Sequence, residues 1–338
     1  MHSVPQDFFE PLEETDLRSD FVVKPLIPFS RYVWWRFKEN KLALAGLFIA
    51  SILLIFACIG PLLTPFSYTE QILPLKNKPP GYRFYVKLEL DHQGNRHIVD
   101  YSEEPIIKET GFQVESRTFW FGSDALGRDL FARIWYGARI SLAIGLITPL
   151  IVFVIGLIYG GISGLIGGWV DEIMMRVVEI LSAIPFLLYV ILLMVLMEPG
   201  LKTIFIALGA VYWMPMARMV RGQILSLKEE EYVQASRILG AGIGHIIFRH
   251  ILPNCLGPIM VYLTLGIPEA IFTESWLSFL GLGVSAPVAS WGTLASDGLK
   301  GIQSFPWQLF FPAAMISLTM FSFYVVGDGL KDVLDPKI

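Results

Sequence analysis

The sequence predicts an all-α protein that crosses a membrane about six times, with short helices in one cytoplasmic connection and a small external insertion that contains β-structure. Two observations predict this fold class. The 338 residues are 54% hydrophobic and only 17% charged, whereas soluble proteins average about 25% charged residues. Uncharged runs of membrane length also recur along the chain. The net charge of −4 is spread over tails and loops, so it indicates no nucleic-acid partner.

Residues 1–41 are expected to form a cytoplasmic tail, acidic at its start and basic just before the first apolar run. Residues 42–63 contain no charged side chain, and about 20 such residues suffice to span a core of roughly 30 Å. We therefore expect the first transmembrane helix there. No earlier apolar core suits a cleaved signal peptide, so this helix is expected to stay in the mature protein.

Further apolar runs predict the remaining spans. They are residues 140–169, 176–197, 203–220, 251–282 and 307–326. Basic residues are concentrated before the first span and in the loop after the fourth. Because positive charge favours the cytoplasmic side, both termini and that loop are predicted to be cytoplasmic. Pro185 should bend the third span, and Pro258 and Pro268 should break the fifth.

Residues 64–139, between the first two spans, are predicted to form the external insertion. Apolar residues alternate with others from Phe84 to Leu90, and a Gln-Gly-Asn sequence at 93–95 interrupts the pattern before Ile98. This arrangement predicts a β-hairpin. Two functions remain open for the insertion, a solvated spacer and a docking surface for an external substrate-binding protein.

The polar stretch 229–254 interrupts the apolar runs. Its first part places small and apolar residues on one helical face, at Tyr232, Ala235, Ser236 and Leu239. Glycines at 240, 242 and 244 should end this helix. A second apolar run follows and is expected to stop being helical at Pro253. The stretch is therefore predicted to be two short helices joined by a flexible elbow.

This stretch resembles the coupling loop of permeases from ATP-binding cassette (ABC) importers. The family pattern is a small-residue triplet, three residues, a glycine and a later Leu-Pro pair. Two residues depart from it, Gln234 in place of glutamate and His250 in place of the usual isoleucine. The resemblance implies that the loop docks on a separate ATPase subunit. The residues assigned to coupling are Glu231, Tyr232, Gln234, Ala235, Ser236, Arg237, Gly240, Ala241, Leu252 and Pro253.

A second motif, FGSDALGRDLFARIWYGARISL at 121–142, is dense in charge beside a predicted span. By chemistry alone these charges would suit either a polar network that holds a re-entrant helix or an anchor at the membrane interface. The motif is similar to the C-type permease of dipeptide and oligopeptide importers, and the resemblance covers most of 121–336. A structural role is favoured over substrate contact. The motif residues are Asp124, Gly127, Arg128, Asp129 and Arg139, with Asp171 after the second span.

The fifth span contains two ionisable residues, Glu269 and Glu274. A charge at the bilayer centre costs roughly 2.5–3.5 kcal/mol, so each needs a reason. On a regular helix the two project in different directions, which argues against a paired proton or metal site. We expect one of them to face a water-filled translocation path. Pro185 is a further candidate for that path, because a bend suits a helix that opens and closes, although simple packing is an equal alternative.

The resemblance implies a multi-pass protein in the cytoplasmic (inner) membrane of a prokaryote, with residues 140–338 as the permease core. The implied partners are a second homologous permease subunit in a heterodimer, two ATP-binding subunits, an external substrate-binding protein and membrane lipid. The chain lacks a Gly-Lys-Ser/Thr phosphate loop. We therefore expect no enzyme activity and no cofactor or metal in this chain, with ATP and magnesium held by the partner ATPase subunits.

The predicted function is ATP-driven translocation of peptides, with nickel or another small solute open as an alternative cargo. Two other classes also remain, an ion-coupled secondary transporter and an intramembrane serine protease. The protease alternative depends on a Gly-x-Ser-Gly signature around Ser163. All five histidines lie in predicted polar segments outside the spans, whereas a nucleophilic serine needs a base within reach. Close helix packing explains these small residues better.

Overall fold

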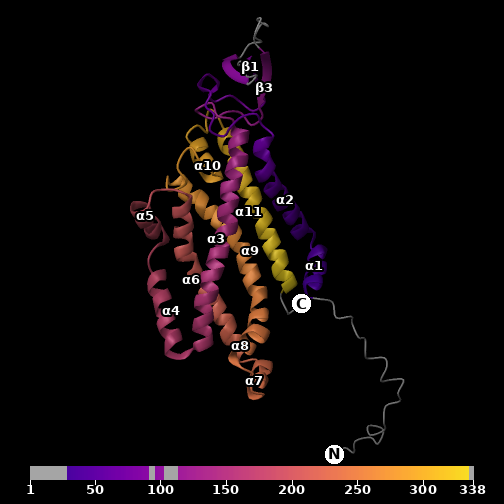
Figure 1. The fold of residues 1–338 in the computed structure, drawn as a ribbon, viewed down its shortest axis with the longest axis vertical. Coiled ribbons are helices and arrows are strands. Elements are labelled where there is room, and N and C mark those ends of the chain that lie inside the picture. Colours follow the sequence, from indigo (N-terminus) through magenta and orange to yellow (C-terminus); the bar gives the residue numbers. More distant parts are fainter. Residues whose placement is uncertain (1–28, 91–95, 103–112, 335–338) are drawn as a thin grey trace, which may run out of the picture.

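A computed structural model describes residues 29–90, 96–102 and 113–334 of the chain. Long helices lie side by side in a bundle, with a small β-sheet at one end and the short helix α7 (Glu231–Ile238) at the opposite end (Figure 1). We call these the sheet end and the α7 end. The predicted acidic tail falls on residues 1–28, and the chain's last charged turn extends into 335–338; both ranges lie outside the described residues.

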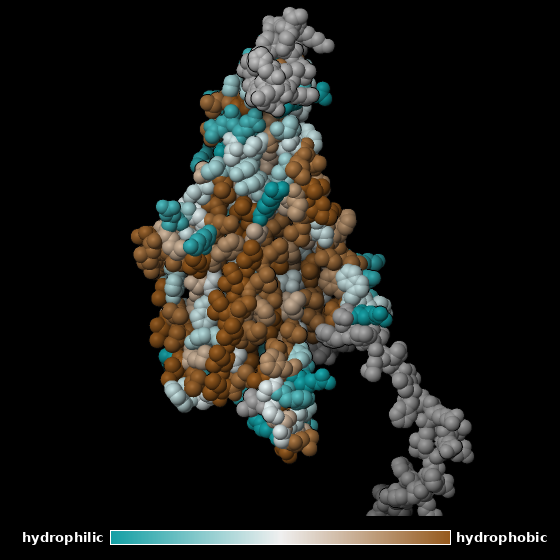
Figure 2. Space-filling model, viewed as in Figure 1, coloured by the Kyte–Doolittle hydropathy of each residue, from teal (hydrophilic) through white to brown (hydrophobic). Residues whose placement is uncertain are grey.

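Among the residues that the structure describes, five helices are long and apolar enough to cross a membrane, and up to six spans result if a bent helix pair is counted as one. This confirms the predicted fold class. On the face drawn in Figure 2, hydrophobic side chains form a broad belt over the helices, and hydrophilic residues gather at the sheet end and near α7. The five helices are α2 (Lys41–Ile59), α3 (Leu130–Ile166), α6 (Leu201–Lys228), α9 (Leu252–Phe279) and α11 (Trp307–Leu334).

The bent pair consists of α4 (Gly168–Ser182) and α5 (Phe186–Leu196), which differ in direction by 79°. Pro185 is the N-cap residue of α5 at this break. Proline has no N–H to donate, and its ring disfavours helical geometry in the residue before it. The predicted bend at Pro185 is therefore confirmed.

Helix α3 begins at Leu130, well before the predicted start at residue 140, so the predicted insertion ends inside this helix. Residues 130–139 are helical, whereas their charges had placed them in the predicted insertion. Asp129 caps the helix by accepting a hydrogen bond from Ala132 N at 3.0 Å. Arg139 donates to the carbonyl oxygens of Ala57 and Cys58, each at 2.7 Å. These polar partners let the helix continue through the charged stretch.

Helix α9 runs unbroken through Pro258 and Pro268, so the prediction of a proline-broken span was wrong. Membrane helices tolerate proline where neighbouring helices and local adjustments satisfy the freed carbonyl groups. The chain also does not leave helical geometry at Pro253, which lies in the first turn of α9, a position where proline is favoured. Before α9 the chain forms α8 (Ile243–Ile246) and a π-helical turn, η5 (Ile247–Ile251).

The sheet contains three antiparallel strands in the order β2-β1-β3. In β1, Val86 pairs with Tyr101 of β2 and with Glu115 of β3. The predicted hairpin is confirmed, although its turn at 91–95 lies outside the described residues. The third strand escaped prediction because QVESRTF carries little apolar alternation. The strands are β1 (Tyr82–Leu90), β2 (Arg96–Ser102) and β3 (Gln113–Phe119).

Two further helices were not predicted, α1 (Phe29–Glu39) and α10 (Trp291–Leu299). Helix α10 begins with a capping box, in which Ser290 and Thr293 each accept a hydrogen bond from the other's backbone N–H. Trp291 is fully buried, and its Nε1 donates to Ile134 O of α3 at 3.0 Å. The Ser-x-x-Thr spacing resembles a capping-box signal, so it offered a clue to this helix.

Helices α3 and α6 pack closely along a row of glycines on α3. A Cβ atom added at Gly160 would lie 2.2 Å from Ala217 O, and one at Gly156 would lie 2.4 Å from Met216 Cγ. Gly161, by contrast, faces open space. The interpretation that small residues here serve helix packing is therefore confirmed for the row that faces α6.

Candidate functional site

A cavity of about 330 Å³ lies in the middle of the bundle, and we call it the mid-bundle cavity. Helices α3, α6 and α9 line it together with the break between α4 and α5. Most of its wall is apolar, with a few polar side chains among the apolar ones. This combination is typical of small-molecule sites. The polar side chains include Thr148, Ser182, Tyr212, Arg218, Tyr262 and Glu269.

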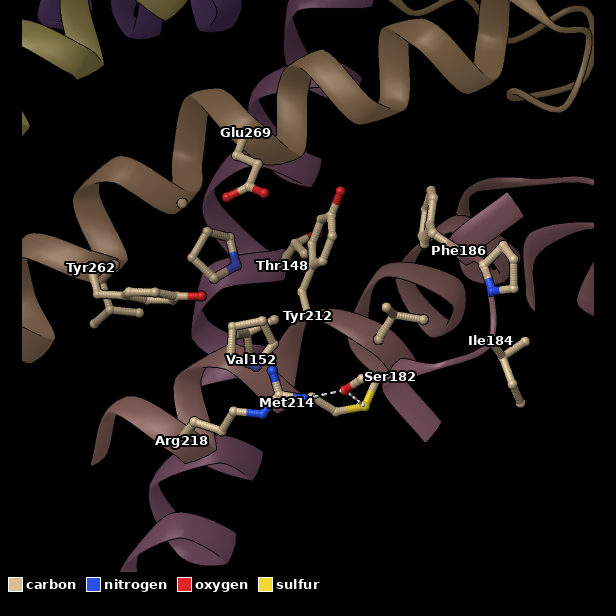
Figure 3. Close-up of a pocket in the computed structure, with 16 residues that line it drawn as sticks. Thr148, Val152, Ser182, Ile184, Phe186, Tyr212, Met214, Arg218, Tyr262 and Glu269 are labelled. Atoms are coloured by element: carbon tan, nitrogen blue, oxygen red, sulfur yellow. Dashed lines mark hydrogen bonds between the residues drawn. The ribbon is translucent and has the colours of Figure 1, made fainter. Parts of the chain in front are cut away.

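The charged groups of this cavity lie on different helices. Figure 3 shows Glu269 and Tyr262 pointing into the cavity from α9, with Arg218 of α6 and Ser182 of α4 at its other end. Arg218 Nη2 donates a short hydrogen bond to Ser182 Oγ. The cavity therefore presents a carboxylate at one end and a guanidinium at the other. Two of the predicted path residues, Pro185 and Glu269, line it.

The third predicted path residue, Glu274, does not line this cavity. Its side chain is fully buried and accepts hydrogen bonds from Ser278 Oγ at 2.7 Å and Ser290 Oγ at 2.6 Å. Ser141 Oγ of α3 lies 3.3 Å from the other carboxyl oxygen. Glu274 thus joins α9 to α3 and to the start of α10. Within the described ranges, no group of three or more His, Cys, Asp or Glu side chains is placed to hold a metal ion.

Residues 231–251, from α7 to the π-turn, form the α7 end of the bundle (Figure 1), and we call them the α7–η5 segment. Val233 of α7 is fully buried and belongs to one hydrophobic cluster with Ile224 of α6 and with Ile251 and Cys255. This cluster fixes the segment to α6 and α9. Both of those helices also line the mid-bundle cavity.

The outer side of the α7–η5 segment carries large apolar side chains without cover. Ile238, Leu239 and Phe248 are 85%, 86% and 74% exposed, and we call them the apolar tip. The sequence placed Leu239 on a helical face, but it gave no signal for Ile238 or Phe248. Apolar groups gathered at an exposed end mark an interaction surface.

Polar contacts join α7 to the π-turn and to the first turn of α9. Ser236 Oγ lies 3.1 Å from His250 Nε2, and Asn254 Nδ2 donates to Tyr232 Oη at 3.2 Å. His250, which departs from the family pattern, thus has a partner inside the segment. Gly240 forms the turn after α7 with φ +84°. The other predicted coupling residues lie beside these, at Glu231, Gln234, Ala235, Arg237, Ala241, Leu252 and Pro253.

At the sheet end, Asp124 binds two arginines. Arg128 Nε lies 2.6 Å from Asp124 Oδ2, and Arg133 Nη1 makes a short contact with the same oxygen. All three side chains are largely buried. Gly127 has φ +72°, and a Cβ there would lie 1.9 Å from Ile72 O, so glycine is required. Arg133 was not predicted as part of the motif, because no local pattern pairs it with Asp124.

Asp129, the N-cap residue of α3, is also buried. Its Oδ2 accepts hydrogen bonds from Ala132 N at 3.0 Å and from Thr64 Oγ1 at 3.1 Å. Its Oδ1 has no hydrogen-bond partner among the described residues. Burial raises the pKa of the Asp129 carboxyl from 3.8 to about 6, because the ionised form loses water.

Asp171 links three helices at the end of the bundle away from the sheet. Arg221 of α6 donates to both of its oxygens at 2.5 Å, and Ser163 of α3 donates a short hydrogen bond to it. Ser163 therefore faces a carboxylate that an arginine already binds. The histidines whose side chains the structure describes, His245 and His250, lie in the α7–η5 segment. This geometry does not form the nucleophile and base of a serine protease.

Comparisons with known proteins agree with this arrangement. The family described as binding-protein-dependent transport system inner membrane component matches residues 153–338, more than half of the chain. The N-terminal TM domain of oligopeptide transport permease C matches residues 28–80. The dipeptide transport system permease protein DppC of Bacillus subtilis (strain 168) is 48% identical over 338 residues, covering 100% of this chain and 95% of its own.

Two oligopeptide transport system permease proteins named OppC are also similar. That of B. subtilis (strain 168) is 45% identical and covers 100% of this chain and 99% of its own, and that of Escherichia coli (strain K12) is 39% identical and covers 89% of each. A solved structure of the MetNI methionine ABC transporter, inward facing, matches 60% of this chain and 96% of its own chain with a TM-score of 0.51. Its identity of 18% supports the fold alone. The chain belongs to the binding-protein-dependent transport system inner membrane components, in the branch of dipeptide and oligopeptide ABC permeases.

Proposed function

We propose that this chain is the permease subunit of an ATP-driven ABC importer that carries short peptides across the cytoplasmic membrane of a prokaryote. Relatives that match its whole length are dipeptide and oligopeptide permeases. The observation that carries the mechanism is a shared framework: α6 and α9 both line the mid-bundle cavity and hold the α7–η5 segment. Motion imposed on that segment would therefore reach the cavity through two rigid helices.

The mid-bundle cavity suits a peptide cargo. A short peptide carries an ammonium group, a carboxylate and variable side chains. Glu269 and Arg218 offer one charge of each sign, and Phe186 and Tyr212 add aromatic wall between the two ends. Contacts of this kind orient a peptide by its termini while tolerating different side chains. A second homologous permease subunit would supply the opposite wall of the path.

The apolar tip is the proposed contact with one ATP-binding subunit, and the second permease would dock the other ATP-binding subunit in the same way. Ile238, Leu239 and Phe248 are too exposed to contribute to the bundle's own core, and burial of each in a partner contributes roughly 1.5–3 kcal/mol. ATP and magnesium would be held by those subunits. Nucleotide-driven movement of the tip would then pass through Val233 into α6 and α9.

This proposal places the α7 end and both termini in the cytoplasm and the sheet end outside, where a substrate-binding protein would deliver peptide. Basic residues near the α7 end support that orientation, because positive charge favours the cytoplasmic side. Arg31, Arg36 and Lys38 lie on α1, which packs beside the C-terminal end of α11 through Phe37 and Val333.

The test is to purify the chain with its partners from its native membrane and reconstitute the complex in liposomes. Co-purifying ATP-binding subunits and ATP-dependent uptake of labelled dipeptide are expected. Uptake should stop on ATP depletion while ion gradients are clamped, and excess nickel should not compete. Uptake that follows an ion gradient, or transport by the isolated chain, would contradict the proposal.

A further inference from the structure

A second cavity, of about 360 Å³, lies at the sheet end of the bundle, and we call it the sheet-end cavity. The loop before α3, the first turn of α3, helix α10 and the start of α11 line it. It shares no lining residue with the mid-bundle cavity. One side of its wall is apolar, with Leu126, Leu294 and Phe305. The charged lining residues are Asp124, Arg128, Arg133, Asp297 and Lys300.

The hydrogen bonds of this cavity leave guanidinium groups only partly used. Asp124 Oδ2 accepts from both Arg128 and Arg133, and Asp124 Oδ1 accepts from Leu126 N at 2.8 Å and Arg128 N at 2.9 Å. That carboxylate is saturated. Arg133 is only 4% exposed, yet its Nε has no hydrogen-bond partner among the described residues. That atom is enclosed, but each guanidinium carries five N–H donors, and Asp124 accepts only one from each side chain, so donors remain on both arginines for an acceptor in the cavity.

The charges that line the cavity also leave an excess of positive charge. Asp297 interacts electrostatically with Arg133, but its hydrogen bond goes to Lys300 Nζ at 3.2 Å on the exposed rim. With that pair matched, one carboxylate, Asp124, faces the two arginines. The inner part of the cavity therefore keeps an excess positive charge of one guanidinium.

We propose that the sheet-end cavity binds the terminal carboxylate of a short peptide. The planar guanidinium presents donors in a fork that matches a carboxylate, and such pairs are among the strongest hydrogen bonds in proteins. The cavity is larger than a carboxylate alone needs, and its apolar wall offers a place for the side chain of the last residue. This inference rests on the proposed function for the identity of the cargo, and it assigns an initial contact outside the mid-bundle cavity.

The test measures binding of N-acetyl-Ala-Phe and of its C-terminal amide to the full chain in lipid nanodiscs by calorimetry. The free acid should bind at least tenfold more tightly than the amide, because the amide carries no charge for the arginines. Equal affinities of the acid and the amide would overturn the proposal. So would displacement of the free acid by inorganic phosphate at the same concentration as by unlabelled free acid.

Two variants and one control locate the binding. Arg128→Gln removes one guanidinium and should lower the affinity for the free acid at least tenfold. Ala125→Trp fills the exposed rim of the cavity while leaving the pairs of Asp124 intact, so it keeps the test valid if Arg128→Gln lowers the unfolding temperature. Arg83→Gln removes the same charge from an exposed position on β1 and should leave affinity unchanged.

The two proposals fail in different ways. A complex that imports peptides while Ala125→Trp binds the free acid like the unaltered chain would overturn the sheet-end site alone. The opposite outcome is also distinguishable. If the unaltered chain binds the free acid and Ala125→Trp does not, the carboxylate site stands. If the complex then imports no peptide, the proposed function is contradicted.

Discussion

Gly240 shows how one backbone angle defines the α7–η5 segment. Its φ of +84° suits glycine, and a Cβ there would meet nothing within 4 Å, so conformation rather than space restricts the position. Gly240→Val should strain the turn by about 1–2 kcal/mol, displace the apolar tip, and strongly reduce ATP-dependent uptake. Membrane insertion and the unfolding temperature should change little.

Gly242→Val is the matched control for that variant. Gly242 also faces open space but has no positive φ, so its uptake should stay close to that of the unaltered chain. If Gly240→Val transports as well as Gly242→Val, the turn has no part in coupling.

The Asp129 carboxyl should make stability depend on pH. Its pKa in the folded protein, about 6, lies above the ordinary 3.8. A raised pKa means that the folded state binds the proton more tightly, so this site contributes its full stability below pH 3.8 and loses it as the pH rises to about 6. The total loss is about 3 kcal/mol at about 1.4 kcal/mol per pKa unit.

Asp129→Asn keeps a side-chain oxygen for the cap but cannot ionise. The difference in unfolding temperature, unaltered chain minus variant, should therefore fall between about pH 4 and pH 7. If the difference in unfolding temperature stays constant over that range, the pKa of the Asp129 carboxyl is not raised in the folded protein.

At the residue level the sequence identified charged and glycine positions but not their partners. Glu269 and Glu274 sit in the same apolar helix, and only packing separates them: one lines a cavity, and the other is enclosed by serines from three elements. Asp124 was found by its motif, whereas its second arginine, Arg133, approaches through tertiary structure.

The glycine row between α3 and α6 yields a prediction at the level of helix packing. Gly160→Ala would put a Cβ 2.2 Å from Ala217 O, and such overpacking typically costs about 1–3 kcal/mol. A lower unfolding temperature is expected in detergent or nanodiscs. Gly161→Ala is the neighbouring control, since its Cβ meets nothing within 4 Å. Equal unfolding temperatures for the two variants would show that the helices separate freely.

The apolar tip yields a prediction about assembly. Leu239 is 86% exposed, so Leu239→Asp should leave the fold intact while placing a charge in the proposed interface. We expect ATP-binding subunits to be lost from the purified complex, with a fall in uptake. Leu239→Met keeps the apolar contact and should retain both. Retention of the subunits by Leu239→Asp would place their docking surface elsewhere.

Helices and strands were predictable where hydrophobicity alone decides them. The long apolar runs correspond to α2, α6, α9 and α11, because a run of membrane length has few other stable structures. Boundaries were harder, since the start of α3 depends on carbonyl groups of α2 that receive Arg139. Helix α10 had only its Ser-x-x-Thr capping signal in the sequence, and the burial of Trp291 against α3 is a tertiary contact.

For the whole molecule, access to the mid-bundle cavity is the property to measure. Ser182 lines that cavity, whereas native Cys255 is buried with 1% exposure. In a Cys58→Ser background, Ser182→Cys should react with a water-soluble maleimide in the assembled transporter, and its rate should change on adding ATP. Cys255 is the internal control and should stay unlabelled. If Cys255 is labelled and position 182 of the Ser182→Cys variant is not, water does not reach the mid-bundle cavity in the assembled transporter.

The overall arrangement was predictable as a membrane bundle with a polar segment at one end and an insertion at the other. The cavities were not, because each is bounded by segments far apart in the sequence. The mid-bundle cavity takes residues from Thr148 to Glu269, and the sheet-end cavity takes residues from Asn77 to Gln308. Only the packed chain brings such segments together.

The length of α3, 37 residues, can be compared with the thickness of a bilayer. At 1.5 Å per residue the helix is about 55 Å long, roughly 25 Å more than the hydrocarbon thickness of a bilayer. An upright α3 would therefore extend beyond the lipid, although a tilt would shorten the overhang, and the sheet precedes its N-terminal end. A substrate-binding protein that docks on that sheet would then meet the permease beyond the lipid headgroups rather than at the level of the hydrocarbon.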